Sequence, residues 1–137
     1  MPISDLALLL RSLTPQLNEG TYVFATLAAN QSVATDDLVA LVRESEGISV
    51  VVDERKALAL GLSAAFRCAW ITLTVNSDLN AVGLTAAFAA ALGNAKISCN
   101  VVAGANHDHI FVPVAQAEEA MTVLRLLQSC PAGADTQ

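Results

Sequence analysis

Basic residues are scarce in this sequence, and their scarcity excludes one large class of function. The chain of 137 residues has 7 Lys and Arg against 13 Asp and Glu, which gives a net charge of −6. Proteins that bind nucleic acid neutralise its phosphates with clusters of Lys and Arg, and this chain has none. We therefore expect no nucleic-acid partner.

Long apolar runs and patterned cysteines are also missing. No apolar run approaches the roughly 18–20 residues that span a bilayer, so we expect no membrane insertion. The apolar start has no basic region before it and meets Arg11 early, which predicts a helix capped by Ser4 and not a signal peptide. The three cysteines, Cys68, Cys99 and Cys130, are far apart and lack metal-type spacing. Reduced thiols in a cytoplasmic protein are the expected interpretation.

Motifs of catalysis are absent from the sequence as well. It has no G-x-S-x-G motif, no glycine-rich phosphate loop and no pair of acidic residues at a spacing typical of a catalytic motif. Cys99 lies in a predicted core strand, where a cysteine usually acts as a small inert hydrophobe. We therefore expect a protein that is not an enzyme and has no cofactor.

The most informative segment runs from Phe66 to Pro113. Residues 66–75 alternate apolar and polar, the period of a strand with one buried face. The period then changes to that of a helix over residues 80–95, followed by strands at 97–103 and 110–112. A helix of this length must cross over the sheet to join parallel strands, so we expect a right-handed βαβ unit.

The predicted helix at 80–95 contains no charged residue. One face carries the larger apolar side chains, and the other is small: Val82, Ala86, Ala89, Ala90 and Gly93. A helix with a solvent-exposed face normally carries charges there, so an uncharged one is usually covered on both sides. The pattern predicts a homodimer or a larger homo-oligomer in which a second copy covers this face.

The remaining elements alternate between helix and strand. Residues 21–28 predict a strand, and Thr35 or Asp36 begins a helix that ends at Gly47. Residues 48–52 predict a strand and 54–60 a helix capped by Asp53 and closed at Gly61-Leu62. Pro113 introduces a last helix with Glu118 and Glu119 at its positive end. Residues 130–137 predict a flexible tail.

The two halves of the sequence show a weak internal repeat. In each half a short apolar strand runs into a helix, in the segments GISVVVDERKALALGL and DHIFVPVAQAEEAMTVL. We expect an α+β fold in which helices cover one face of an antiparallel sheet, built as a degenerate tandem repeat. The predicted units are residues 1–64 and 65–129.

The segments FRCAWITLTVNSDLNAVGLTAA, KISCNVVAG and HDHIFVP resemble ACT domains, and in particular a small stand-alone bacterial group with two ACT-like units. The resemblance implies the ferredoxin-like βαββαβ sandwich and a regulatory role in which an amino acid is bound. Two such units would have eight strands, whereas the sequence predicts five. Either a strand is shared between the units or one has been missed at residues 31–33.

The loop from Asn76 to Thr85 is the main candidate for a ligand site. It joins a strand end to a helix N-terminus, where free N–H groups attract a carboxylate. Gly83 weakens the helix, either to let a ligand approach the backbone or only to allow tight packing. The resemblance also implies that an amino acid lies against this loop and the neighbouring strand. The predicted ligand-binding residues are Asn76, Ser77, Val82, Gly83, Leu84, Thr85, Asn100, His107 and His109.

His107 and His109 are the only histidines in the chain. Residues i and i+2 of a strand share a face, so the two imidazoles could hold one metal. A zinc site needs three or four ligands, however, so we expect no metal and assign the histidines to the hairpin or to a ligand.

The predicted function is thus a non-enzymatic regulatory or sensor protein that binds a small amino acid or similar carboxylate between ACT-like units. The alternative is a structural or partner-binding dimeric subunit without a small-molecule ligand. A third reading is a small metal-assisted enzyme that uses His107 and His109.

Overall fold

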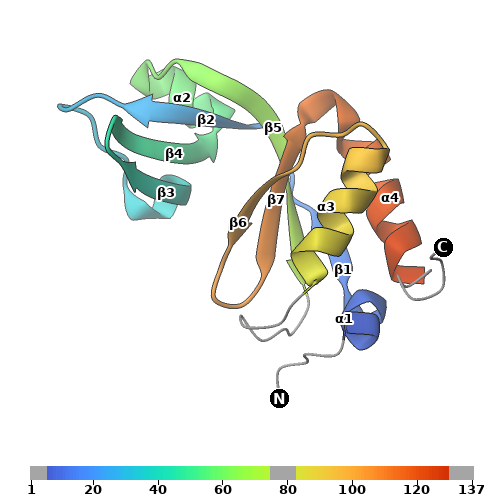
Figure 1. Ribbon diagram of the computed structural model, residues 1–137. Coiled ribbons are helices and arrows are strands. Elements are labelled where there is room, and N and C mark those ends of the chain that lie inside the picture. The colour runs from blue at the N-terminus through green and yellow to red at the C-terminus, as the bar shows by residue number, and fades with distance from the viewer. Residues whose placement is uncertain (1–5, 75–82, 130–137) are drawn as a thin grey trace.

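The structure is a computed structural model that describes residues 6–74 and 83–129 (Figure 1). Within these ranges the helices are α1 (Leu6–Ser12), α2 (Glu54–Leu60), α3 (Leu84–Asn94) and α4 (Ala117–Ser129), with short 3-10 helices at Thr35–Asp37 and Val114–Gln116. The strands are β1 (Thr14–Leu17), β2 (Tyr22–Leu27), β3 (Leu38–Glu44), β4 (Gly47–Asp53), β5 (Ala64–Thr74), β6 (Asn100–Ala103) and β7 (Asp108–Pro113).

The strands form one antiparallel sheet in the order β3-β4-β2-β5-β7-β6, and β1 also pairs with β5. The long strand β5 serves both halves of this sheet. Its residues 64–68 pair with β2, whereas residues 71–74 pair with β1 and residues 68–73 with β7. Two four-stranded arrangements, β5-β2-β4-β3 and β1-β5-β7-β6, therefore share β5, which runs through both parts of the molecule in Figure 1.

The α+β, ferredoxin-like fold with helices on one face of the sheet is confirmed. Ala69, Ile71 and Leu73 of β5 point into a core beneath α1, α3 and α4, and Val23 and Ala25 of β2 pack beneath α2. The opposite face is not bare, because Cys68 is 0% exposed and Thr72 only 9% exposed. The prediction that β5 buries one face alone was wrong, since the curled sheet partly covers its own helix-free face.

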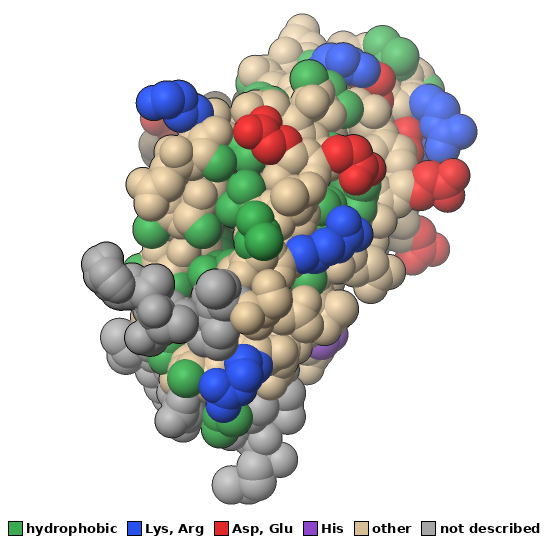
Figure 2. Space-filling view, turned by 90° about the vertical axis from the view of Figure 1, so that its right-hand side faces the viewer, with side chains coloured by type: hydrophobic (Ala, Val, Ile, Leu, Met, Phe, Trp, Pro, Cys, Tyr) green, Lys and Arg blue, Asp and Glu red, His purple; other side chains and the backbone are tan. Residues whose placement is uncertain are grey.

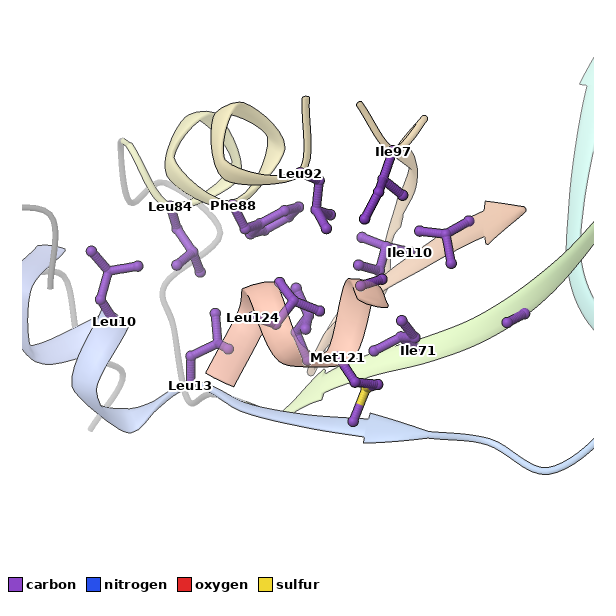
Figure 3. Close-up of a cluster of buried hydrophobic side chains, with 14 of the residues drawn as sticks. Leu10, Leu13, Ile71, Leu84, Phe88, Leu92, Ile97, Ile110, Met121 and Leu124 are labelled. Carbon is purple, nitrogen blue, oxygen red and sulfur yellow. The ribbon is translucent and has the colours of Figure 1, made fainter. Parts of the chain in front are cut away.

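The main core lies between helices α1, α3 and α4 and the part of the sheet that includes β5 and β7 (Figure 3). Leu84, Phe88 and Leu92 project from α3 at helical spacing towards α4 and the sheet. The facing residues come from α1, β5, β7 and α4: Leu10, Leu13, Ile71, Ile110, Met121 and Leu124. The predicted apolar stripe of this helix is confirmed.

Helix α2 has the ends that the sequence predicts. The Asp53 carboxylate accepts a hydrogen bond from the backbone N–H of Arg55 at 2.8 Å. At the other end Gly61 is left-handed, with φ at 70°, and the N–H of Leu62 donates to the carbonyl of Ala57 at 2.9 Å. This is the Schellman-type closure that Gly61-Leu62 predicts.

The predicted helix between residues 35 and 47 was wrong. Only the 3-10 turn Thr35–Asp37 is helical, and the segment continues as β3. Residues 38–42 are apolar throughout and include two valines, which suit a strand paired with β4. Gly47 allows the tight return between the two strands, because its φ of 147° suits glycine alone.

Two further predictions need correction. The sequence predicts no strand directly after α1, whereas Thr14 and Pro15 begin β1, which pairs only with β5 and tolerates a proline on its unpaired edge. Strand β7 separates β5 from β6, so the two strands predicted as neighbours in a βαβ unit do not pair with each other. The strands that the sequence analysis missed are therefore residues 14–17 and 38–44, and not residues 31–33. The alternative that the two units share one strand is confirmed, because β5 pairs in both halves of the sheet.

Between β2 and β3, where every residue is described, the chain forms a loop and one 3-10 turn but no α-helix. The first half therefore lacks a helix that the second half has as α3, which makes the repeat degenerate. The predicted boundary at residue 64 falls on the first residue of β5, and the pairing of β1 with β5 crosses it. The division of the chain stays a prediction.

Candidate functional site

The predicted ligand loop is only partly described by the structure. Asn76, Ser77 and Val82 lie outside the described residues. Gly83 is the N-cap of α3 and not a residue of its first turn, and its φ of 103° is left-handed. A Cβ atom built at Gly83 would lie 3.2 Å from Cδ2 of Leu6. Conformation and packing by this chain itself therefore both favour glycine at this position.

The next two residues of the loop have different surroundings. Leu84 is 5% exposed and belongs to the main core, whereas Thr85 is exposed. The first turn of α3 carries no acidic residue, and no side chain of the described residues caps it. The amides of this turn thus remain available to an anion as far as the described residues are concerned.

Asn100 lies at the start of the edge strand β6, where it is exposed. Its side-chain Nδ2 donates to the backbone carbonyl of Phe111 at 3.3 Å. Because Asn100 is paired with Phe111, both side chains lie on the helix-free face of the sheet. The structure therefore separates Asn100 from Leu84, which packs on the helix side.

The two histidines have different roles. His107 is exposed in the turn before β7, and its carbonyl accepts a hydrogen bond from the N–H of Gly104 at 2.9 Å. His109 is half-buried on the helix-free face, where its Nδ1 accepts from Nε1 of Trp70 at 3.1 Å. The hydroxyl of Thr72 lies 3.3 Å from the same nitrogen. The Trp70 bond requires an unprotonated Nδ1, and burial lowers the pKa of His109 below its ordinary value.

These contacts bear on the hypothesis that His107 and His109 hold a metal ion. The tryptophan donor occupies Nδ1 of His109, which leaves only Nε2 of that ring for a metal. The described residues contain no group of three or more His, Cys, Asp and Glu side chains that could hold an ion. The absence of a metal stays a prediction.

A hydrogen-bond network extends from His109 to β1. The Asn18 side chain, which follows β1, donates to Oγ1 of Thr72 at 3.0 Å and to the carbonyl of Trp70 at 3.1 Å. The backbone N–H of Asn18 also donates to that carbonyl at 2.9 Å. Trp70 is therefore fixed at both its backbone and its ring.

The cysteines support the expectation of unreactive thiols. Cys68 is 0% exposed, and burial raises the pKa of its thiol to about 12. Burial also raises the pKa of Cys99. A thiol with a raised pKa is a poor nucleophile, because the thiolate is the reactive form. Cys130 lies outside the described residues.

A groove of about 650 Å³ is the feature that sequence reasoning missed. It borders the end of β4 and the beginnings of β2 and β3 and reaches Trp70 on β5. Its lining residues are Tyr22, Asp36, Asp37, Leu38, Val39, Asp53, Arg55, Lys56, Ala59 and Trp70. Four separate segments build it, so no local motif marks it. The available signal was Trp70, which the alternation of residues 66–75 places on the face opposite Ile71.

Comparisons with known proteins identify the family. One ACT-domain model matches residues 1–69, and a second ACT-domain model matches residues 65–125. The chain belongs to the ACT domain family. A comparison with curated proteins finds no match.

Solved structures agree with this assignment. A Vibrio cholerae protein of unknown function, described as a possible transport protein, is 42% identical, and the match covers 90% of this chain and 95% of that one with a TM-score of 0.78. An Agrobacterium tumefaciens protein is 17% identical, and the match covers 85% of this ACT-domain chain and 89% of the Agrobacterium chain with a TM-score of 0.62.

The Escherichia coli aspartokinase III complex with aspartate and ADP matches 86% of this chain and 33% of its own at 13% identity and a TM-score of 0.58. A putative C-terminal regulatory domain of aspartate kinase from Porphyromonas gingivalis covers 83% of this chain and 95% of its own at 14% identity and a TM-score of 0.57. These likenesses show the fold of regulatory ACT domains. No helix of the described residues has the length and apolar character to cross a membrane.

Proposed function

We propose that this chain is a non-enzymatic, cytoplasmic regulatory protein that binds a small amino acid, or a similar carboxylate, at an interface between ACT units. The units are residues 1–64 and 65–129, followed by a tail at 130–137, and β1 of the first unit completes the sheet of the second. The aspartate-bound aspartokinase of the same fold supports the choice of ligand class.

The observation that best supports the proposal is the exposed, uncharged outward face of α3. Its inward face is core, but its outward residues Ala86, Ala90 and Gly93 are exposed and uncharged. Figure 2 shows the side of the molecule where α3 and α4 lie, with apolar side chains between separated charges. The first turn of the same helix offers amides to a carboxylate. A second copy packed against this helix would enclose that turn.

The edges of the sheet support a second copy on this side. The edge strand β6, Asn100–Ala103, carries no charge, whereas the edge strand β3 carries Arg43 and Glu44. Charges on an edge discourage pairing with another chain. We therefore propose a homodimer that forms through α3 and β6.

The test is a thermal-shift screen against the twenty amino acids, since a ligand that binds only the folded state raises its stability. At least one amino acid should raise the melting temperature. Thr85→Asp places a negative charge in the first turn of α3, which suits the helix dipole but repels a carboxylate. We expect this variant to stay folded and lose the shift, and Thr85→Asn to keep it. A wild type that responds to no amino acid would overturn the proposal.

The second candidate is a dimeric partner-binding subunit without a small-molecule ligand. The exposed uncharged face of α3 favours it, because such a face suits a protein surface. A stable dimer that shows no shift with any amino acid would support this candidate over the first.

A further inference from the structure

We propose that the groove beside Tyr22 and Trp70 binds a small organic cation, with a primary ammonium or guanidinium group, against the two aromatic rings. None of its lining residues belongs to α3. It is therefore a site separate from the carboxylate site proposed above. Its volume of about 650 Å³ lies within the usual range for small-molecule sites.

The aromatic wall of the groove is held in place before any ligand arrives. The rings of Tyr22 and Trp70 meet edge to face, with 5.3 Å between their centroids. The indole Nε1 donates to His109, and the Tyr22 hydroxyl donates to the carbonyl of Glu19 at 2.7 Å. A wall that is already ordered loses little freedom on binding. Aromatic faces attract ammonium and guanidinium groups.

The charges around the groove favour a cation over an anion. Both basic side chains already have partners: Lys56 lies 3.2 Å from the Asp37 carboxylate, and Arg55 lies 3.3 Å from Asp53. Among the described residues, the Asp36 carboxylate has no ion-pair partner and leaves one negative charge uncompensated. An anion would have to compete with the Asp37 and Asp53 carboxylates for these cations, whereas a cation would find Asp36 available.

The surroundings of the Tyr22 hydroxyl also favour a positively charged ligand. Burial raises the pKa of Tyr22, and the Asp53 and Glu19 carboxylates raise it further, which outweighs the opposing effect of Arg55. At the Tyr22 hydroxyl the two carboxylates therefore outweigh the Arg55 guanidinium. A ligand with a positive group is stabilised in such a field.

Trp70 is the only tryptophan of the chain, so at a fixed pH its emission reports on the surroundings of this one residue of the groove. The probe is 1,5-diaminopentane titrated into the full-length protein, with 1,5-pentanediol as the uncharged control of equal length. We expect a saturable change in emission with the diamine and none with the diol. An equal response to both, or no response to the diamine, would overturn the proposal.

Single substitutions separate the contribution of the aromatic wall to diamine binding from the contribution of the Asp36 charge. Asp36→Asn removes an exposed charge and should weaken binding about fivefold, as expected for two charges about 4 Å apart in a water-like dielectric. Tyr22→Leu should also weaken binding, whereas Tyr22→Phe, which keeps the ring, should retain it. Glu118→Gln in α4, outside the groove, should have no effect.

The two proposed sites can fail independently. Thr85→Asp should leave the diamine titration unchanged, because Thr85 is not part of the groove. If Asp36→Asn bound the diamine as tightly as the wild type, the cation would lie elsewhere and the proposal would be wrong, whatever the amino-acid screen had shown.

Discussion

One ring nitrogen, Nδ1 of His109, joins two strands of the helix-free face by accepting a hydrogen bond from Trp70. Burial, and next the charge of His107, lower the pKa of His109. An unfolded histidine, with a pKa of about 6.5, therefore binds a proton more readily than the folded one. The contribution of His109 to stability is complete above about pH 6.5 and is lost as the pH falls through its lower folded value.

We predict that the free energy of unfolding decreases as the pH drops below about 6.5, and that Trp70 emission changes over the same range. Urea titrations at several pH values would measure the first effect. In His109→Gln the decrease over this range should be smaller. His107→Gln keeps the bond from Trp70 and the burial of His109, and should retain most of the decrease. A His109→Gln variant with the wild-type pH dependence would contradict this account.

A second prediction compares two glycines at opposite ends of α3. Gly83→Ala would place a side chain on a residue with φ of 103° and against Leu6, so we expect a loss of about 1–3 kcal/mol. Gly93→Ala would meet no atom of the described residues within 4 Å and should gain about 0.5–1 kcal/mol from helix propensity. Urea unfolding of both variants gives the comparison. Equal effects would mean that the backbone at Gly83 is not strained.

Among the elements, α1 and β1 connect the two halves of the chain. Leu9, Leu10 and Leu13 are each 0% exposed in the core beneath α3 and α4, and β1 covers the edge of β5. We predict that deletion of residues 1–17 abolishes cooperative thermal unfolding, because it removes core side chains and exposes a strand edge. Deletion of residues 130–137 serves as the control and should leave the melting curve unchanged. Cooperative unfolding of the first variant would contradict the prediction.

The elements also differ in how far the sequence predicts them. Helix α2 is predictable because its signals, Asp53 and Gly61-Leu62, lie within the helix and its ends. Strand β1 is not, since four residues containing Pro15 form a strand only through pairing with β5. Strand β3 misleads because an apolar run after two aspartates also fits a capped helix.

The candidate site shows the same limit. The local sequence identifies a helix after the polar turn because the apolar period changes there, but it places the start at residue 80, whereas α3 begins at Leu84. It does not reveal the bond from Trp70 to His109 or the groove beside Tyr22, since these residues come together only in the folded sheet. Contacts between distant segments are the part that local patterns leave out.

At the scale of the whole molecule, the proposed homodimer depends on the outward face of α3. We predict that the protein sediments as a dimer or larger assembly at micromolar concentration. Ala86→Glu combined with Ala90→Glu should give a folded monomer, because both positions are exposed and two charges would then face the partner. Leu58→Glu, at a residue of α2 that is 74% exposed, should leave the assembly unchanged. A monomeric wild type would show that this face has no partner copy.

The pairing of β1 with β5 has a consequence for synthesis of the chain. The carbonyl of Thr14 accepts a hydrogen bond from Thr74, which lies 60 residues later. At about 5–20 residues per second, the ribosome completes that interval in roughly 3–12 s. During this time the apolar face of α1 has left the ribosome before most of its core neighbours exist. We therefore expect the yield of folded protein to respond to the supply of chaperones that hold apolar segments, more than its final stability does.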